Sequence, residues 1–124
     1  MGDVRVLVVD DQEPFRSAMR AVVEETEGFV VAGSAATGEE AIARSAELRP
    51  DLVLMDVNLP GIDGIEATRR LTAEPGGPEV VLLSTYDEDR FDLAGCGATA
   101  YVAKAALGPD RLAAAWAGAS HPDQ

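Results

Sequence analysis

The chain has 124 residues, which is the length of one ordinary domain. Its 22 acidic side chains outnumber the 10 lysines and arginines, which gives a formal net charge of -12. Such a surface repels phosphate backbones and anionic headgroups, so direct binding of nucleic acid or membrane by these residues is disfavoured. The apolar runs are shorter than the roughly 18 residues of a membrane span. A single cysteine, Cys96, excludes an internal disulfide and favours a reducing, cytoplasmic setting.

Short apolar segments predict five β-strands. Val4–Val9 is rich in β-branched residues and almost wholly apolar, which is typical of a strand covered on both faces. Four more segments have the same character and are bounded by turn residues or charges: Phe29–Ala35, Leu52–Met55, Val80–Leu83 and Ala100–Val102.

The segments between these strands have helical spacing. The first predicted helix has Pro14 in its first turn and an apolar face made of Phe15, Ala18, Met19, Val22 and Val23. Thr37 and Glu40 have the spacing of a capping box that opens a second helix through about Glu47. Further helices are predicted over about 63–71 and about 88–94, and from about 109 onward.

Five strands alternating with five helices predict an α/β fold with a parallel, doubly wound sheet and right-handed crossovers. We expect one domain over residues 1–118, with residues 119–124 as a flexible tail or the start of a linker. Ligands of such sheets bind beyond the carboxyl ends of the strands. The strand ends are therefore the place where we expect a functional site.

Polar side chains follow four of the predicted strands. Asp10 and Asp11 end the first strand and Asp56 ends the third, while Ser84 and Thr85 follow the fourth and Lys104 follows the fifth. Three carboxylates at one sheet edge need a counterion, and oxygen ligands of this kind suit Mg²⁺. Singly, each residue also fits a helix cap, a strand exit or a surface position. Their joint placement favours a site that binds a phosphoryl group, with an aspartate as a possible nucleophile.

These residues resemble the receiver domain of two-component response regulators over essentially the whole chain, from Val4 to about Ala117. The most specific segment is Leu52-Val-Leu-Met-Asp56-Val-Asn-Leu-Pro60-Gly-Ile-Asp-Gly64, together with Val6-Leu-Val-Val-Asp10-Asp11. The phrase Gly64-Ile-Glu-Ala-Thr-Arg-Arg-Leu71 resembles the LuxR/NarL-type subgroup, whose members usually carry a C-terminal helix-turn-helix domain. The resemblance implies a flavodoxin-like, CheY-like fold with strand order 2-1-3-4-5 and helices on both faces.

The resemblance also implies a role for each polar residue at the strand ends. Asp56 is similar to the aspartate that takes a phosphoryl group from a histidine kinase. Mg²⁺ would be held by Asp11 directly, by Asp10 through water, by Asp56 and by the backbone carbonyl of Asn58. Ser84 matches the switch hydroxyl and Lys104 the lysine that pairs with a phosphoryl oxygen. Tyr101 stands at the position of the switch aromatic.

Phosphorylation would then reshape the face formed by helix 4, strand 5 and helix 5 of the family fold. The sequence departs from the family pattern at two places near that face. Ser84 and Lys104 are 20 positions apart, which is slightly fewer than usual. Ala105 follows the lysine, where many receivers have a proline.

The leading hypothesis is a phospho-accepting signalling switch whose catalysis is limited to its own phosphorylation and dephosphorylation. Its partners would be a sensor histidine kinase, a second copy of the chain in a homodimer, and DNA only through an output domain outside these residues. One alternative is a Mg²⁺-dependent phosphatase with an aspartyl-phosphate intermediate. Haloacid-dehalogenase-like phosphatases have Asp-x-Asp on the first strand, whereas Asp10-Asp11-Gln12 stands here. The other alternative is an interaction module that works without phosphorylation.

Overall fold

The computed structural model describes residues 3–84 and 96–118. Five strands form one parallel sheet in the order β2-β1-β3-β4-β5. Their bounds are β1 Val4–Val9, β2 Phe29–Ala35, β3 Leu52–Asp56, β4 Glu79–Ser84 and β5 Ala100–Ala103. The predicted fold class and strand order are confirmed, and no strand end differs from its predicted position by more than one residue.

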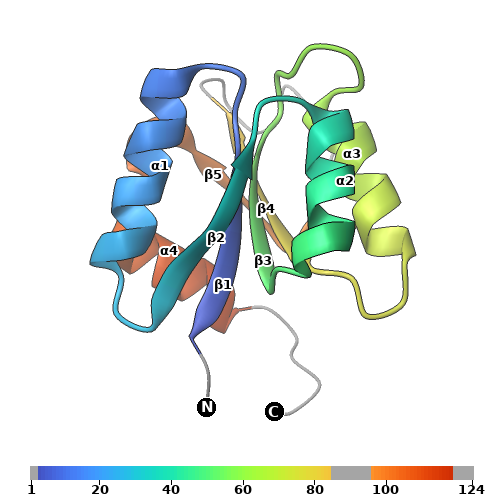
Figure 1. Cartoon of the computed structure of the whole chain (residues 1–124). Coiled ribbons are helices and arrows are strands. Elements are labelled where there is room, and N and C mark those ends of the chain that lie inside the picture. The colour runs from blue at the N-terminus through green and yellow to red at the C-terminus, as the bar shows by residue number, and fades with distance from the viewer. Residues whose placement is uncertain (1–2, 85–95, 119–124) are drawn as a thin grey trace.

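Helices cover both faces of the sheet, as Figure 1 shows. Helices α1 (Glu13–Glu25) and α4 (Pro109–Ala117) lie on one face, and α2 (Gly38–Leu48) and α3 (Gly64–Ala73) lie on the other. A short 3₁₀ turn, Lys104–Ala106, follows β5 and was not predicted. The helix predicted over 88–94 lies outside the described residues, so α4 in Figure 1 is the fifth predicted helix. None of the helices in the described ranges is long and apolar enough to cross a membrane.

The strand residues alternate between two buried clusters, one on each face of the sheet. On the α1/α4 face, Val6, Leu54 and Leu83 belong to a cluster that also contains Met19, Val23 and Leu112. On the α2/α3 face, Leu7, Met55 and Leu82 belong to a cluster that also contains Ala41, Ala67 and Leu71. Because both faces are buried, the strands are almost continuously apolar rather than alternating with polar residues.

The sequence signals at the helix starts are confirmed with one difference. The Thr37 hydroxyl accepts a hydrogen bond from the backbone N–H of Glu40 (3.0 Å), as a capping box requires. The Glu40 carboxylate, however, accepts from the N–H of Ala36 (2.8 Å) instead of from Thr37 itself. Asp63 caps α3 in the same way, because its side chain accepts from the N–H of Glu66 (2.8 Å).

The predicted apolar face of α1 is only partly buried. Met19 and Val23 are buried in the core, whereas Phe15 and Ala18 are exposed. The two exposed residues still lie on the predicted face, because they line one cavity together with Met19 and Val22. Phe15 retains 38% of its surface in solvent.

Gly64 lies where the loop after β3 returns to the backbone of the strand. A Cβ atom on Gly64 would lie 2.1 Å from the carbonyl oxygen of Asp56 and 2.9 Å from Cα of Val57. The N–H of Gly64 donates to the carbonyl of Val57 (2.9 Å), which fixes this close approach. Any larger residue must therefore push the first turn of α3 away from Asp56.

We expect Gly64→Ala to lower the free energy of unfolding by about 1–3 kcal/mol, because the contact it creates is with backbone that cannot rotate away. Urea unfolding followed by circular dichroism measures this. Gly118→Ala is the matched control: its Cβ would meet its nearest atom at 3.5 Å, and its effect should stay within about 0.5 kcal/mol. Equal stability of the two variants would contradict the packing argument.

Candidate functional site

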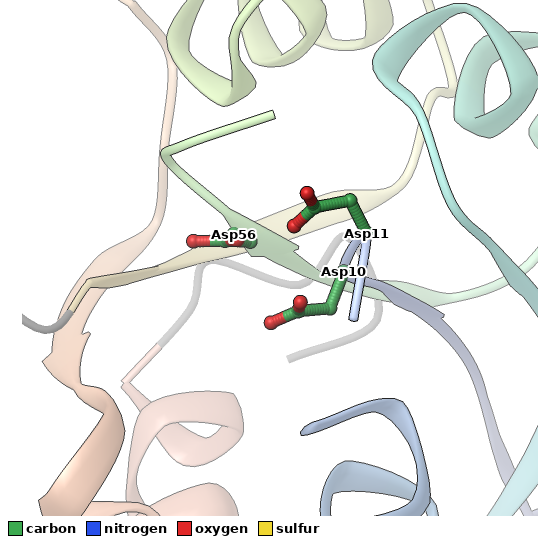
Figure 2. A group of neighbouring side chains, drawn as sticks. All are labelled: Asp10, Asp11 and Asp56. Atoms are coloured by element: carbon green, nitrogen blue, oxygen red, sulfur yellow. The ribbon is translucent and has the colours of Figure 1, made fainter. Parts of the chain in front are cut away.

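Three carboxylates converge at the carboxyl edge of the sheet. Asp10 follows β1 directly and Asp56 is the last residue of β3. Val9 pairs with Met55 in the register of these strands, so Asp10 and Asp56 lie side by side. Each of Asp10, Asp11 and Asp56 has a carboxylate oxygen that lies within 4.8 Å of the other two (Figure 2). The predicted convergence of these residues is thus present in the structure.

Alternation of side chains separates Asp10 from Asp11. Val6 and Val8 face α1 and α4, and Asp10 continues that row, whereas Asp11 continues the row of Leu7 and Val9 on the other face. In Figure 2 the Asp10 carboxylate accordingly lies toward α1 and the Asp11 carboxylate toward α2 and α3, with Asp56 between them. The site therefore has two sides, each reached from a different face of the sheet.

Lys104 supplies positive charge at the site. Its Nζ lies 2.7 Å from Oδ2 of Asp10 and 3.4 Å from Oδ2 of Asp56. The lysine side chain is only 13% exposed, and both carboxylates are almost fully buried. Lys104 comes directly after β5, so this ion pair joins residues from three strands. It confirms that Lys104 lies with Asp10 and Asp56, as the strand ends predicted.

Backbone donors hold the two buried carboxylates in place. Asp10 Oδ1 accepts from the N–H of Gln12 (2.9 Å), and Asp56 Oδ1 accepts from the N–H of Asn58 (3.2 Å). Three carboxylates against one ammonium nevertheless leave negative charge in excess among these four groups. Like charges at this separation destabilise one another unless a cation or a proton joins them.

Asp56 shows the cost of this arrangement in its pKa. The pKa of the Asp56 carboxyl is raised from 3.8 to about 6; burial is the largest cause, and the charge of Asp10 acts in the same direction. The Lys104 ammonium and the Asn58 N–H act in the opposite direction and lower the pKa. The balance leaves Asp56 easier to protonate than an ordinary aspartate, although it remains mostly ionised at neutral pH.

The donor set fits a hard divalent cation. All three side chains offer carboxylate oxygens, which Mg²⁺ and Ca²⁺ prefer over nitrogen or sulfur. Asp11 is exposed, while both oxygens of Asp10 already have partners in Lys104 and Gln12. Asp11 is therefore better placed than Asp10 for direct contact with a solvated ion. The acidic cluster is a pocket that could bind a metal.

The other predicted site residues lie nearby in the fold. Ser84 is buried at the end of β4, one residue beyond Leu83, which pairs with Asp56. Tyr101 is half-buried on β5 and packs against the cluster that contains Leu82, on the α2/α3 face. Asn58 is exposed two residues after Asp56. The roles predicted for these three residues stay predictions.

Sequence reasoning missed two neighbours of the site. The ring of Phe15 lies under Lys104, with Nζ 4.1 Å from its centroid. The Arg16 guanidinium donates to the backbone carbonyl of Asp10 (2.7 Å) and to Glu13 (2.7 Å). The signal for Phe15 was its place four residues after Asp11, on the first turn of a helix that starts at the strand end. Helical spacing placed it on an apolar face and gave no sign of its contact with Lys104.

This arrangement of a doubly wound sheet with an acidic cluster and a lysine at its carboxyl edge matches a known domain. A family model described as the response regulator receiver domain matches residues 6–117. The chain belongs to this family. It is a phosphoryl-accepting receiver domain of the two-component response regulators.

Similarity to individual response regulators supports the same family assignment. The response regulator GacA of Pseudomonas viridiflava is 42% identical over 83% of this chain and 49% of its own length. A crystal structure of a LuxR-family two-component response regulator from Aurantimonas sp. is 33% identical, with a TM-score of 0.83 over 98% of this chain and 92% of that chain. The predicted resemblance to the LuxR/NarL-type subgroup is thereby confirmed.

Receiver domains also occur in proteins of another kind. A protein-glutamate methylesterase/protein-glutamine glutaminase of Alkalilimnicola ehrlichii is 38% identical over 82% of this chain, but over only 27% of its own length. This receiver chain spans about half the length of GacA and less of the methylesterase. Family membership therefore describes the receiver domain and leaves the activity of any attached domain open.

The raised pKa of Asp56 predicts how its charge affects folding. Below pH 4 the Asp56 carboxyl is protonated in both the folded and the unfolded chain. As the pH rises toward about 6 the unfolded chain releases this proton first, so the folded chain loses stability. With divalent cations chelated, Asp56→Asn should therefore raise the free energy of unfolding by about 2–3 kcal/mol at pH 8 and by about half as much at pH 5. Urea unfolding at both pH values measures the difference.

Asp3→Asn is the control for this experiment because Asp3 is exposed and lies outside the elements of the fold. Its effect should be within about 0.5 kcal/mol at either pH. A stabilisation by Asp56→Asn that is the same at pH 5 and pH 8 would contradict a role for the buried charge.

Proposed function

We propose that Asp56 accepts the phosphoryl group in this receiver domain. The observation that carries the proposal is the place of its carboxylate, which is buried at the end of β3 between Lys104 and two further aspartates. A buried carboxylate facing a cation can act as a nucleophile, because fixed charges can neutralise the incoming phosphoryl oxygens. Asp10 already forms the closer ion pair with Lys104, and Asp11 is exposed, so Asp56 is the best placed of the three.

In the proposed reaction an oxygen of Asp56 attacks the phosphorus of a phosphohistidine on a sensor histidine kinase. An O–P bond forms, the P–N bond breaks, and its electron pair remains on the imidazole of the kinase. Lys104 stays protonated and moves its ion pair from Asp10 and Asp56 to a phosphoryl oxygen. Hydrolysis of the acyl phosphate by water returns Asp56 to its starting state. Catalysis by this chain is limited to these two steps on its own side chain.

Mg²⁺ is the proposed cofactor, held by Asp11 directly, by Asp10 through water, by Asp56 and by the backbone carbonyl of Asn58. When bound, it would neutralise charge on the phosphoryl oxygens during transfer. Backbone donors orient the carboxylates that would face the ion. The N–H of Gln12 fixes Asp10, and the N–H of Asn58 fixes the Asp56 oxygen that does not face Lys104. The excess negative charge of the cluster supports the assignment.

The response to phosphorylation is proposed to involve Ser84 and Tyr101. A dianion on Asp56 would attract the Ser84 hydroxyl, and the space it leaves would admit the ring of Tyr101. Both residues belong to the α2/α3 face of the sheet, since Leu82 lies on that face, Ser84 follows it by two residues and Tyr101 pairs with it. The surface that changes would include β5 and α4 together with the segment that contains residues 88–94.

Partners and setting follow from the proposed reaction. In the cytoplasm, a sensor histidine kinase would donate the phosphoryl group, and two copies of the chain would form a homodimer. Contact with DNA would belong to an output domain outside these residues, since the net charge of -12 opposes it here. The receiver unit itself is proposed to span residues 1–118, with residues 119–124 as a tail or the start of a linker.

We expect intact mass spectrometry to detect one added phosphoryl group after incubation of the chain with acetyl phosphate and Mg²⁺. Asp56→Asn should abolish the adduct because the nucleophilic oxygen is lost, and chelation of the metal should do the same. Asp51→Asn, at the opposite edge of the sheet, is the matched control and should keep the adduct. An adduct on Asp56→Asn would contradict the assignment. Turnover of p-nitrophenyl phosphate in the same sample would favour the phosphatase alternative.

We further expect Mg²⁺ to raise the melting temperature of the chain, because an ion that binds only the folded state stabilises it by mass action. At a concentration of about 100 times Kd the gain is about 2.7 kcal/mol. Asp11→Asn should remove most of this Mg²⁺-dependent increase, whereas Asp51→Asn should retain it. Differential scanning fluorimetry with and without the ion makes the comparison within each variant. An increase that survives in Asp11→Asn would exclude this residue as the direct ligand.

A further inference from the structure

Phe15 forms a contact with the site that the proposed reaction leaves unexplained. The Lys104 Nζ atom lies 4.1 Å from the centroid of the Phe15 ring, within the range of a cation–π interaction. An ammonium group has three N–H bonds. Here the carboxylates of Asp10 and Asp56 lie within ion-pair distance of Nζ, and the ring is a third neighbour of the charge. The lysine is thus surrounded by groups that attract its charge, although Phe15 itself carries none.

The exposure of Phe15 shows that burial alone does not explain its place. Its ring retains 38% of its surface in solvent, in contrast to Met19 and Val23 farther along the same helix. Together with Met19, Leu83 and Leu107, Phe15 and Lys104 line a small cavity of about 60 Å³. The ring therefore lies at the solvent edge of the core, beneath the ammonium of the lysine rather than inside the apolar cluster.

The first turn of α1 is anchored to the strand that carries Asp10. Arg16, the residue after Phe15, donates to the backbone carbonyl of Asp10 (2.7 Å). Glu13 pairs with Arg16 (2.7 Å) and with Arg20 (2.9 Å), and these pairs link the first two turns of the helix. The hydrogen bond from Arg16 to the Asp10 carbonyl thus ties the first turn of α1, which carries the Phe15 ring, to the residue that carries the Asp10 carboxylate. The ring thus has a fixed position from which to act on Lys104.

A lysine side chain needs such a constraint at this site. Its four-carbon stem is flexible and its ammonium is strongly hydrated, so a partly exposed lysine readily turns toward water. The attraction of a ring face to a cation is broad in direction, unlike a hydrogen bond. Phe15 can therefore hold the ammonium near the site while the lysine exchanges one oxygen partner for another.

We propose that Phe15 is a positioning residue for Lys104, and that its ring keeps the ammonium next to Asp56 while the phosphoryl group is transferred. This inference rests on the proposed function of Asp56 and adds to it a residue that never touches the reacting atoms. With acetyl phosphate, the Asp56 oxygen forms the O–P bond and acetate leaves with the electron pair of the broken P–O bond. Lys104 remains protonated throughout. Phe15 affects the rate only through the place of the ammonium.

Two measurements on Phe15→Leu test the proposal, since leucine keeps an apolar side chain but removes the ring face. The first is NMR of the lysine side chains, in which the ring should shift the Lys104 Hε signals upfield. Loss of the Lys104 signals in Lys104→Met assigns them. The shift should disappear in Phe15→Leu and remain in Phe15→Tyr. Phe29→Leu is the matched control, because that ring packs on Trp116 at the opposite edge of the sheet and should leave the shift unchanged.

The second measurement is the rate of phosphorylation by acetyl phosphate, a donor small enough to need no protein docking surface. Phe15→Leu should slow the reaction by about threefold to tenfold, whereas Phe15→Tyr and Phe29→Leu should keep the rate of the natural sequence. In the Lys104→Met background, where no ammonium remains, Phe15→Leu should cause no further loss. This last comparison separates action through Lys104 from a general effect on folding.

Contrary outcomes are distinct. An unchanged rate in Phe15→Leu, with or without the loss of the Lys104 shift, would overturn the positioning role. An equal slowing in the Lys104→Met background would overturn it too, because the ring would then act by another route. Absence of any adduct on the natural sequence would instead mean that the proposed function of Asp56 is wrong.

Discussion

The repulsion among Asp10, Asp11 and Asp56 is the constraint on which the rest of this receiver domain depends. Three carboxylates with oxygens within 4.8 Å of one another face a single ammonium, and two of them are buried. The Lys104 ion pairs and the backbone donors to Asp10 and Asp56 offset part of the repulsion, and burial of the apolar layers on both faces of the sheet offsets the rest. The fold therefore holds negative charge where a cation and a phosphoryl group can relieve the strain, as the raised pKa of Asp56 indicates.

Much of the fold and the core of the site were predictable because both follow from periodicity. The nearly continuous apolar runs predicted buried parallel strands, and parallel strands bring their carboxyl ends to one edge. Asp10, Asp56 and Lys104 are up to 94 positions apart, yet they meet there by topology alone. The order of strands and helices along the chain was therefore enough to predict that these three residues meet. The helix cap at Thr37 was equally accessible, since a cap depends on residues three positions apart.

What the sequence left open depends on distances between elements. Helical spacing placed Phe15 on an apolar face, but periodicity does not indicate that the ring is exposed and contacts Lys104. Gly64 belongs to the most specific motif, but spacing alone does not show that its small size is needed for contact with the carbonyl of Asp56. The closer pairing of Lys104 with Asp10 than with Asp56 is likewise a matter of fractions of an ångström. The roles of Ser84 and Tyr101 stay predictions for a different reason, since switching is a difference between two states.

Alternation along the strands divides the site into two sides with different physical tasks. Asp10, Lys104 and Phe15 lie toward α1 and α4, where the hydrogen bond from Arg16 and the ion pair to Asp10 fix the positions of the charges. Asp11, Ser84 and Tyr101 lie toward α2 and α3, and they include the exposed carboxylate and the candidate switch residues. By the same alternation Asp56 belongs to the first set, since Leu52 and Leu54 lie in the cluster of the α1/α4 face, and the second set lies beside it at the sheet edge. A phosphoryl group on its carboxylate would be held by the charges of the first set, while Ser84 and Tyr101 of the second set would respond to it. One new bond at the sheet edge can thus change the packing on the opposite face of the sheet.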